Sequence, residues 1–317
     1  MSVSIDDPSS AFSRRHLLKW LAGGVGVIIV GGAAGVELVN KGILPGKQYL
    51  NEIDGACDVT APTLDYAVLG QSMSGTFYSR ARHREVGYTL AYPTGHAAGD
   101  PIALVIMLHG YGGTHLDAFV DMTPVQASAL VTTFVNNAAP VRRYAPVAVV
   151  TVDGGGGYWN PHPGDDPMGM VVDELIPMLQ TRGVGRPSNG VGLMGISMGG
   201  YGALAIGERY PKEFRAIAAI SPAVWTSFNQ AHDANANAFA SAADFAAHDV
   251  IAHAAALSHI PVRVASGVDD PFHPGVVQLI RALAPDSESY VGSGCHSSPF
   301  FLSQEPPSLA FLAAHLL

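Results

Sequence analysis

The feature that most constrains this chain is a series of short, uniformly apolar runs separated by stretches of helical pattern. Runs of about four to eight such residues are typical of parallel strands that are buried on both faces of a sheet. The runs cover residues 102–108, 147–152, 191–194, 216–220 and 262–265. Because they alternate with helical patterns, the sequence predicts one α/β domain with a mostly parallel central sheet flanked by helices.

Further elements extend this pattern on both sides. Residues 86–92 alternate in side-chain size and end at Pro93, as an early antiparallel strand would. Thr123 and Pro124 form an N-cap and first-turn pair, which predicts a helix over 124–136. Later helices are expected at residues 170–179, 201–208, 275–283 and 308–315.

Two interpretations stay open for residues 222–245, which lie between the fourth and fifth apolar runs. Trp225 and Phe228 are followed there by many Ala and Asn residues. The segment is expected to form either a small cap over a pocket or an ordinary surface excursion.

The N-terminus has the layout of a targeting segment. Arg14 and Arg15 precede an apolar run over residues 20–36, and small residues follow, which is typical of a twin-arginine export signal. The alternative is an uncleaved membrane anchor, since a run of 17 residues lies at the lower edge of bilayer-spanning length. We expect a signal over 1–35, a linker over 36–62 and a catalytic domain over 63–317, with membrane contact through the N-terminal segment alone.

Composition excludes several classes of protein. The 317 residues include 17 basic and 26 acidic side chains, which gives a formal charge of −9. This acidic balance does not favour binding to the negatively charged backbone of nucleic acid. Hydrophobic residues make up 48% of the chain, which is enough for a sizeable core. Two cysteines are too few for a disulfide scaffold or a Cys-based zinc site. The sequence therefore predicts a globular protein that binds neither nucleic acid nor a structural metal.

The chemical signal is the pattern Gly195-x-Ser197-x-Gly199. It lies between the apolar run 191–194 and the helical pattern that begins at Tyr201. Small residues on both sides let the backbone turn sharply and lift the serine oxygen above the sheet. A plain glycine-rich turn with Ser197 as a helix cap is the alternative, but a strand before and a helix after favour a nucleophile.

A nucleophilic serine needs a base and a group that orients the base, and in this architecture they follow the serine as Asp or Glu and then His. Asp269 and Asp270 follow the apolar run 262–265, and His296 lies in a small-residue loop before the last helical pattern. The Gly-x-x-Asp spacing common at hydrolase strand ends, counted from Gly267, selects Asp270. Asp269 is the alternative acid.

The remaining late histidines fit the role of base less well. His232 precedes the acid, and His273 follows it too closely. His253, His259 and His315 lie in helical or helix-end contexts. His296 is therefore the predicted base.

An oxyanion site is expected in residues 108–113, directly after a buried strand. The glycines of this loop let backbone N–H groups face a developing negative charge. The usual partner is the N–H just after the nucleophile, here Met198. His109 precedes the nucleophile in the chain, which favours a structural or orienting residue over a triad member. The glycine-rich segment 153–159 is interpreted as a loop at the rim of the active site.

One disulfide is expected between Cys57 and Cys295. An exported protein works where a disulfide persists, and the chain has two cysteines with none left over. The bridge would hold the linker segment that contains Cys57 against the loop that contains His296. The alternative is two free thiols, with Cys295 buried as a small apolar residue.

These motifs resemble the esterase D and antigen 85-type esterases of the α/β-hydrolase superfamily. The resemblance runs from Gly75 to the C-terminus and rests on residues 108–113, 153–155, 173–177, 195–200 and 295–296. It implies hydrolysis of a small-molecule or lipid carboxylic ester through an acyl-serine intermediate, with no metal and no organic cofactor. It also implies that Tyr111, the residue after His-Gly, and Met198 supply the oxyanion amides.

The resemblance is weaker toward the antigen 85 proteins themselves, which are mycolyl transferases. Their oxyanion loop begins Asp-Gly where this chain has His109-Gly110, and their acid is a glutamate where this chain has Asp269 or Asp270. These departures favour a general serine esterase. An acyltransferase to sugar hydroxyls and a non-catalytic envelope binding protein are the alternatives. With the export signal, the resemblance implies a secreted or cell-envelope protein of an actinobacterium.

Overall fold

Eight strands form one mixed sheet in the order β1-β2-β4-β3-β5-β6-β7-β8. The computed structural model describes residue 57 and residues 59–116, 122–138 and 143–317, so the expected signal and most of the expected linker lie outside the described residues. The described residues belong to the unit Asn51–Leu317. The strands are β1 (Ser72–Ser79), β2 (Arg84–Ala91), β3 (Ala103–Leu108), β4 (Val147–Val152), β5 (Val191–Ile196), β6 (Ala216–Ile220), β7 (Val262–Gly267) and β8 (Glu288–Gly292).

The strands from β4 to β8 in this order run parallel, while β1 and β2 pair antiparallel at one edge. The predicted single α/β domain with a mostly parallel central sheet flanked by helices is confirmed. The helical segments are α4 (Pro124–Asn137), α5 (Pro167–Gly169), the π-helical η1 (Met170–Leu175), α6 (Ile176–Gln180), α7 (Met198–Arg209), α8 (Phe228–Ala234), α9 (Ala242–Ala247), the 3₁₀ η2 (Ala254–Leu257), α10 (His273–Ala282) and α11 (Ser298–His315). Among the described residues, no helix is both long and apolar enough to cross a membrane.

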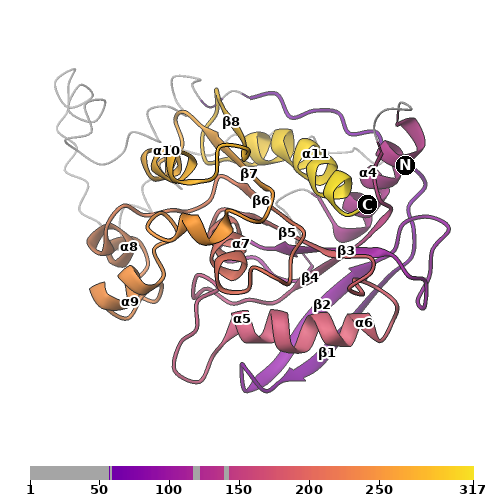
Figure 1. Cartoon of the computed structure of the whole chain (residues 1–317), viewed down its shortest axis with the longest axis horizontal. Helices are drawn as coiled ribbons and strands as arrows, with labels where there is room; N and C mark the ends of the chain where they lie inside the picture. Colours follow the sequence, from indigo (N-terminus) through magenta and orange to yellow (C-terminus); the bar gives the residue numbers. More distant parts are fainter. Residues whose placement is uncertain (1–56, 58, 117–121, 139–142) are drawn as a thin grey trace, which may run out of the picture. The chain divides into compact units, whose positions relative to one another are not determined.

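Helices cover both faces of the sheet because its central strands are apolar on both sides. In β3, Leu104 and Ile106 belong to the apolar layer that also contains residues of α6, α7 and α10, while Val105 and Met107 belong to the layer that contains residues of α4 and α11. Figure 1 shows α4 and α11 on one side of the strands and α5 and α6 on the other. This burial on both faces explains why the strands read as uniform apolar runs rather than alternating ones.

The structure corrects the sequence interpretation at the exposed edges and at the last helix. Strands β1 and β8 were not expected, because their side chains are mostly exposed and form no apolar run. Helix α11 begins at Ser298 rather than at residue 308 and contains Pro306 and Pro307. A proline inside a helix costs about 3 kcal/mol. Burial of Phe300 and Leu309 against the sheet offsets that cost.

The chain reverses its direction of winding at β3. The connection from β3 leads to β4 on one side, and the chain then crosses to β5 on the other side of β3. Ligands of open α/β sheets bind at such a switch point, beside the carboxyl ends of the strands. The loop after β3 and the turn after β5 are therefore neighbours at the edge where chemistry is expected.

Candidate active site

Ser197 occupies the turn between β5 and α7. Its backbone angles, φ 56° and ψ −121°, lie in a region that side-chain-bearing residues rarely adopt. Two bonds hold it there: its amide donates to the Ile220 carbonyl at 3.0 Å, and its carbonyl accepts from the Ala223 amide at 2.9 Å. The strained turn is thus fixed by the end of the neighbouring strand β6.

Two glycines make this turn sterically feasible. A Cβ at Gly195 would lie 2.0 Å from the Gly199 carbonyl oxygen, and a Cβ at Gly199 would lie 2.0 Å from the Leu108 carbonyl oxygen. Both obstacles are backbone atoms, which cannot rotate away. The Gly-x-Ser-x-Gly pattern is therefore a requirement of close backbone packing between β5, α7 and β3.

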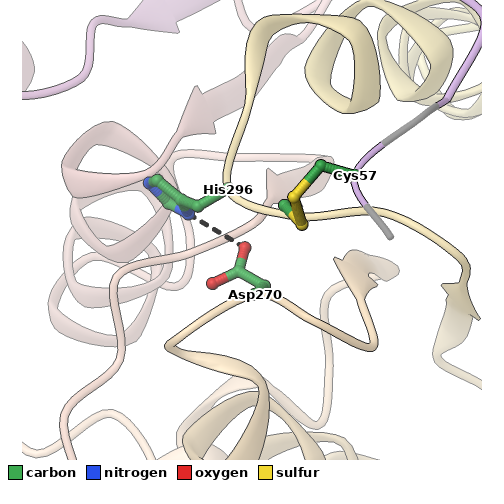
Figure 2. The surroundings of a disulfide bond; sticks show 4 residues. Cys57, Asp270 and His296 are labelled. Atoms are coloured by element: carbon green, nitrogen blue, oxygen red, sulfur yellow. Dashed lines mark hydrogen bonds and ion pairs between the residues drawn. A yellow bond between two sulfur atoms is a disulfide. The ribbon is translucent and has the colours of Figure 1, made fainter. Parts of the chain in front are cut away.

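His296 lies between Ser197 and Asp270. Its Nε2 is 2.8 Å from Ser197 Oγ, and its Nδ1 is 2.9 Å from Asp270 Oδ2. The second contact is the dashed line in Figure 2. Because a carboxylate only accepts hydrogen bonds, Nδ1 carries the imidazole proton and Nε2 is left to accept the serine proton. The structure thus brings all three predicted triad residues together.

The surroundings of Asp270 and His296 hold both side chains in place. The Asp270 side chain is fully buried, and its Oδ1 accepts a bond from the Phe272 amide at 2.8 Å. The His296 ring meets the rings of Phe272 and Phe301 edge-on, each at a centroid distance of 5.0 Å. The imidazole therefore has little freedom to rotate away from the serine.

The turn that carries the predicted acid and the loop that carries the predicted base are joined by backbone hydrogen bonds. The Val268 amide donates to the Gly292 carbonyl at 2.8 Å, and the Asp269 amide donates to the Gly294 carbonyl at 3.0 Å. The second bond uses the backbone of Asp269, while Asp270 is the carboxylate that reaches His296. The geometry thus distinguishes the two adjacent carboxylates.

A disulfide joins Cys57 to Cys295, the residue directly before His296 (Figure 2). The two Cα atoms are 5.0 Å apart and the cysteines are separated by 238 positions. For a loop of this length, chain entropy sets an upper contribution of about 5 kcal/mol to stability. The start of the described chain is therefore tied to the loop of the predicted base.

The two expected oxyanion residues line the same cavity as Ser197. Met198 is the first residue of α7, where a helix leaves its amide without an intrahelical acceptor. Tyr111 lies in the loop after β3. Both positions therefore border the cavity that contains the serine, where amides for a developing oxyanion are needed.

The cavity itself has a volume of about 470 Å³ and is mostly apolar. Sequence reasoning missed most of its walls, because aromatic side chains from distant segments carry no shared sequence signal. The aromatic residues that line it are Tyr111, Tyr158, Trp225, Phe272 and Phe301.

Residues 222–245 contribute directly to this wall. Trp225 Nε1 donates to the Tyr158 hydroxyl at 2.9 Å, and Asn235 Nδ2 donates to the Gly156 carbonyl at 3.1 Å. Burial raises the pKa of Tyr158 to about 12, so this hydroxyl is neutral at physiological pH. Both Trp225 and Asn235 line the cavity, which favours the cap interpretation over a remote surface excursion.

The five competing histidines lie elsewhere among the described residues. None of them lines the cavity around Ser197. His253 pairs with Glu208 at 2.9 Å, and the His315 ring bonds to the Phe311 carbonyl at 2.8 Å. Within the described ranges, no three His, Cys, Asp or Glu side chains are placed to hold a metal ion.

The sequence pattern of the family described as "Putative esterase" matches residues 79–274. No curated protein matches the chain in sequence. Many solved structures share the fold.

One similar structure is an S-formylglutathione hydrolase from Agrobacterium tumefaciens (18% identity, TM-score 0.62, 81% of this chain and 100% of the other). Another is a CE1 ferulic acid esterase from Anaeromyces mucronatus (14% identity, TM-score 0.61, 82% of this chain and 95% of the other). A third is a fluorophosphonate-binding serine hydrolase from Staphylococcus aureus (13% identity, TM-score 0.60, 77% of this chain and 99% of the other). At these identities the likeness is one of fold.

The close packing of the turn at Ser197 predicts a large stability difference between two glycine-to-alanine substitutions. Gly199→Ala forces a methyl group onto the Leu108 carbonyl, and overpacking of this kind costs about 1–3 kcal/mol or more. Gly110→Ala is the control, since its Cβ would find its nearest neighbours at 3.6 Å. Urea unfolding of the two variants measures the difference. Equal midpoints would contradict the close contact.

The two adjacent carboxylates are expected to differ sharply in importance. Asp270→Asn places an amide at His296 Nδ1 and favours the wrong tautomer, for which a loss of about 10⁴-fold in kcat is expected. Asp269→Asn should cause a much smaller loss. Steady-state rates on a chromogenic ester compare them, and the reverse order would transfer the orienting role to Asp269.

Proposed function

The chain belongs to the "Putative esterase" family and is a carboxylic ester hydrolase, and we propose that it is an exported serine esterase with Ser197 as nucleophile. The observation that carries the proposal is the hydrogen-bonded series from Ser197 through His296 to Asp270, with distances of 2.8 and 2.9 Å. The series supports nucleophilic catalysis because each group has the partner that its role requires.

In the acylation step, Ser197 Oγ attacks the ester carbonyl carbon while its proton passes to His296 Nε2. The imidazolium that forms is stabilised by the buried carboxylate of Asp270, which stays ionised. The carbonyl oxygen becomes an oxyanion and is held by the amides of Tyr111 and Met198. Collapse of this intermediate breaks the bond to the alcohol, which takes the proton from His296 and leaves an acyl-serine.

Deacylation repeats the same steps with water in place of the serine. Water gives a proton to His296 Nε2 and attacks the acyl carbon, and Ser197 then leaves with that proton. The products are a carboxylic acid and an alcohol. The ester, one water molecule and the side chains of the triad account for every atom and proton in this sequence of steps.

The substrate is a small-molecule ester with an apolar or aromatic acyl group. The cavity of about 470 Å³ with its aromatic walls supports this class. The similar structures are described as a ferulic acid esterase and an S-formylglutathione hydrolase, and of these two acyl groups the aromatic one matches the walls better.

The site of action is outside the cytoplasm. The arginine pair and the apolar run that follows it support export by the twin-arginine route, to the cell envelope or the medium. The disulfide at Cys295 is consistent with an oxidising compartment.

The nucleophile is tested by Ser197→Ala. Removal of the nucleophile from such a unit lowers kcat by about 10⁶-fold. The variant should neither hydrolyse chromogenic esters from acetate to palmitate nor react with a fluorophosphonate probe, while its circular dichroism stays that of the wild type. Turnover near the wild-type rate would refute the proposal.

Product analysis with an added sugar acceptor separates hydrolysis, which yields free acid, from acyl transfer, which yields a sugar ester.

Export is tested by Arg14→Lys with Arg15→Lys in a bacterium that has the twin-arginine system. The double variant should stay in the cytoplasm with both cysteines alkylatable without reductant, while the exported wild type should need reductant. The control is His16→Lys, because this substitution leaves the arginine pair intact. Export of the double variant at the wild-type level would rule out this route.

A further inference from the structure

His109 is a buried histidine in the oxyanion loop, and both of its ring nitrogens are bonded to backbone. Nε2 accepts a hydrogen bond from the Gly154 amide at 2.9 Å, and Nδ1 lies 2.7 Å from the Gly110 carbonyl oxygen. The side chain is 2% exposed and its ring lies 5.1 Å from that of Trp159. Trp159 Nε1 also donates to the His109 carbonyl at 3.3 Å.

These partners fix the tautomer of the ring. An amide N–H can only donate, so Nε2 carries a lone pair, and a carbonyl can only accept, so Nδ1 carries the proton. The imidazole of His109 is therefore neutral in this arrangement. It connects the loop after β4, which contains Gly154, to the loop after β3.

The Gly110 carbonyl belongs to the peptide group that contains the Tyr111 amide. A trans peptide group is planar, with its C=O and N–H pointing in opposite directions. A bond that holds the carbonyl therefore also sets the direction of the Tyr111 N–H. This peptide lies beside the nucleophile, since a Cβ on Gly110 would be 3.6 Å from the Ser197 Cβ.

We propose that His109 is a positioning residue that aims the Tyr111 amide at the oxyanion through the Gly110 carbonyl. The inference rests on the proposed function, because it assigns His109 to the same reaction. An apolar residue at this position would fill the space but leave the buried Gly154 amide without its acceptor. It would also remove the imidazole bond to the Gly110 carbonyl, which would then keep its bond from the Gly113 amide at 3.1 Å but lose the partner that sets the direction of the peptide from the β4 side.

The test compares an ester with the matching thionoester, in which sulfur replaces the carbonyl oxygen. Sulfur accepts hydrogen bonds weakly, so hydrolysis of the thionoester draws little on the oxyanion amides. Removal of one oxyanion donor lowers kcat by about 10²-fold. In His109→Leu, we expect the kcat for the ester to fall by up to that factor, with KM little changed. The thionoester rate should change much less, so the ratio of ester to thionoester kcat falls.

Two further variants separate the two ring contacts. His109→Asn keeps an N–H group near the position of Nδ1, and His109→Gln keeps an acceptor near the position of Nε2. The asparagine variant should retain the higher ester kcat and the higher ratio. His315→Leu is the control, since it removes a histidine bond to a backbone carbonyl away from the cavity and should leave the ratio unchanged.

A fall in both rates by the same factor in His109→Leu, which leaves the ratio equal to that of the wild type, would overturn the positioning role. If the leucine variant does not fold, the asparagine and glutamine pair decides, and equal or reversed ratios would overturn the role. Absence of ester turnover by the wild type would instead refute the proposed function itself.

Discussion

The backbone of α7 begins against the carbonyl of Leu108, at the end of β3, with no room for a side chain at Gly199. This contact brings the ends of β3 and β5 together, so the loop after one strand faces the turn after the other. The strained angles of Ser197 are sustained by the same packing and by bonds to the end of β6. Without this close approach, Tyr111 and Ser197 would not line the same cavity.

The proposed base His296 reaches the proposed nucleophile Ser197 across 99 positions of sequence, and several independent contacts hold it there. The acid turn and the base loop share backbone hydrogen bonds, and a Cβ at Gly267 would lie 2.1 Å from the Gly294 carbonyl oxygen. The disulfide also restrains this loop, through Cys295. These restraints fix a loop that follows β8, the exposed strand at the edge of the sheet.

The sequence predicts those parts of the fold and site that depend on local pattern. The buried strands, the capped start of α4 at Thr123 and the turn at Ser197 follow from periodicity and from glycine geometry. Asp270 could be preferred over Asp269 by spacing, but which carboxylate faces His296 depends on how two loops pair. Edge strands and the start of α11 were missed because exposure and tertiary packing, rather than local pattern, determine them.

The cavity walls could not be predicted for the same reason. Trp225 and Tyr158 are 67 positions apart and are joined by a single side-chain hydrogen bond. Each has an ordinary sequence context, and no spacing rule relates them. Substrate preference is therefore the property least accessible from the sequence, although it depends on residues that the structure places together plainly.

The active site contains two histidines whose rings carry the proton on the same nitrogen, yet their partners give them different capacities. In both His109 and His296, Nδ1 faces an oxygen acceptor and Nε2 faces a donor. The donor at His109 is an amide, which does not give up its proton, and the acceptor is a neutral carbonyl. The donor at His296 is a hydroxyl, and the acceptor is a carboxylate that stabilises an imidazolium. These partners suit His296 to the proton transfer of the proposed mechanism, while they suit His109 to a positioning role alone.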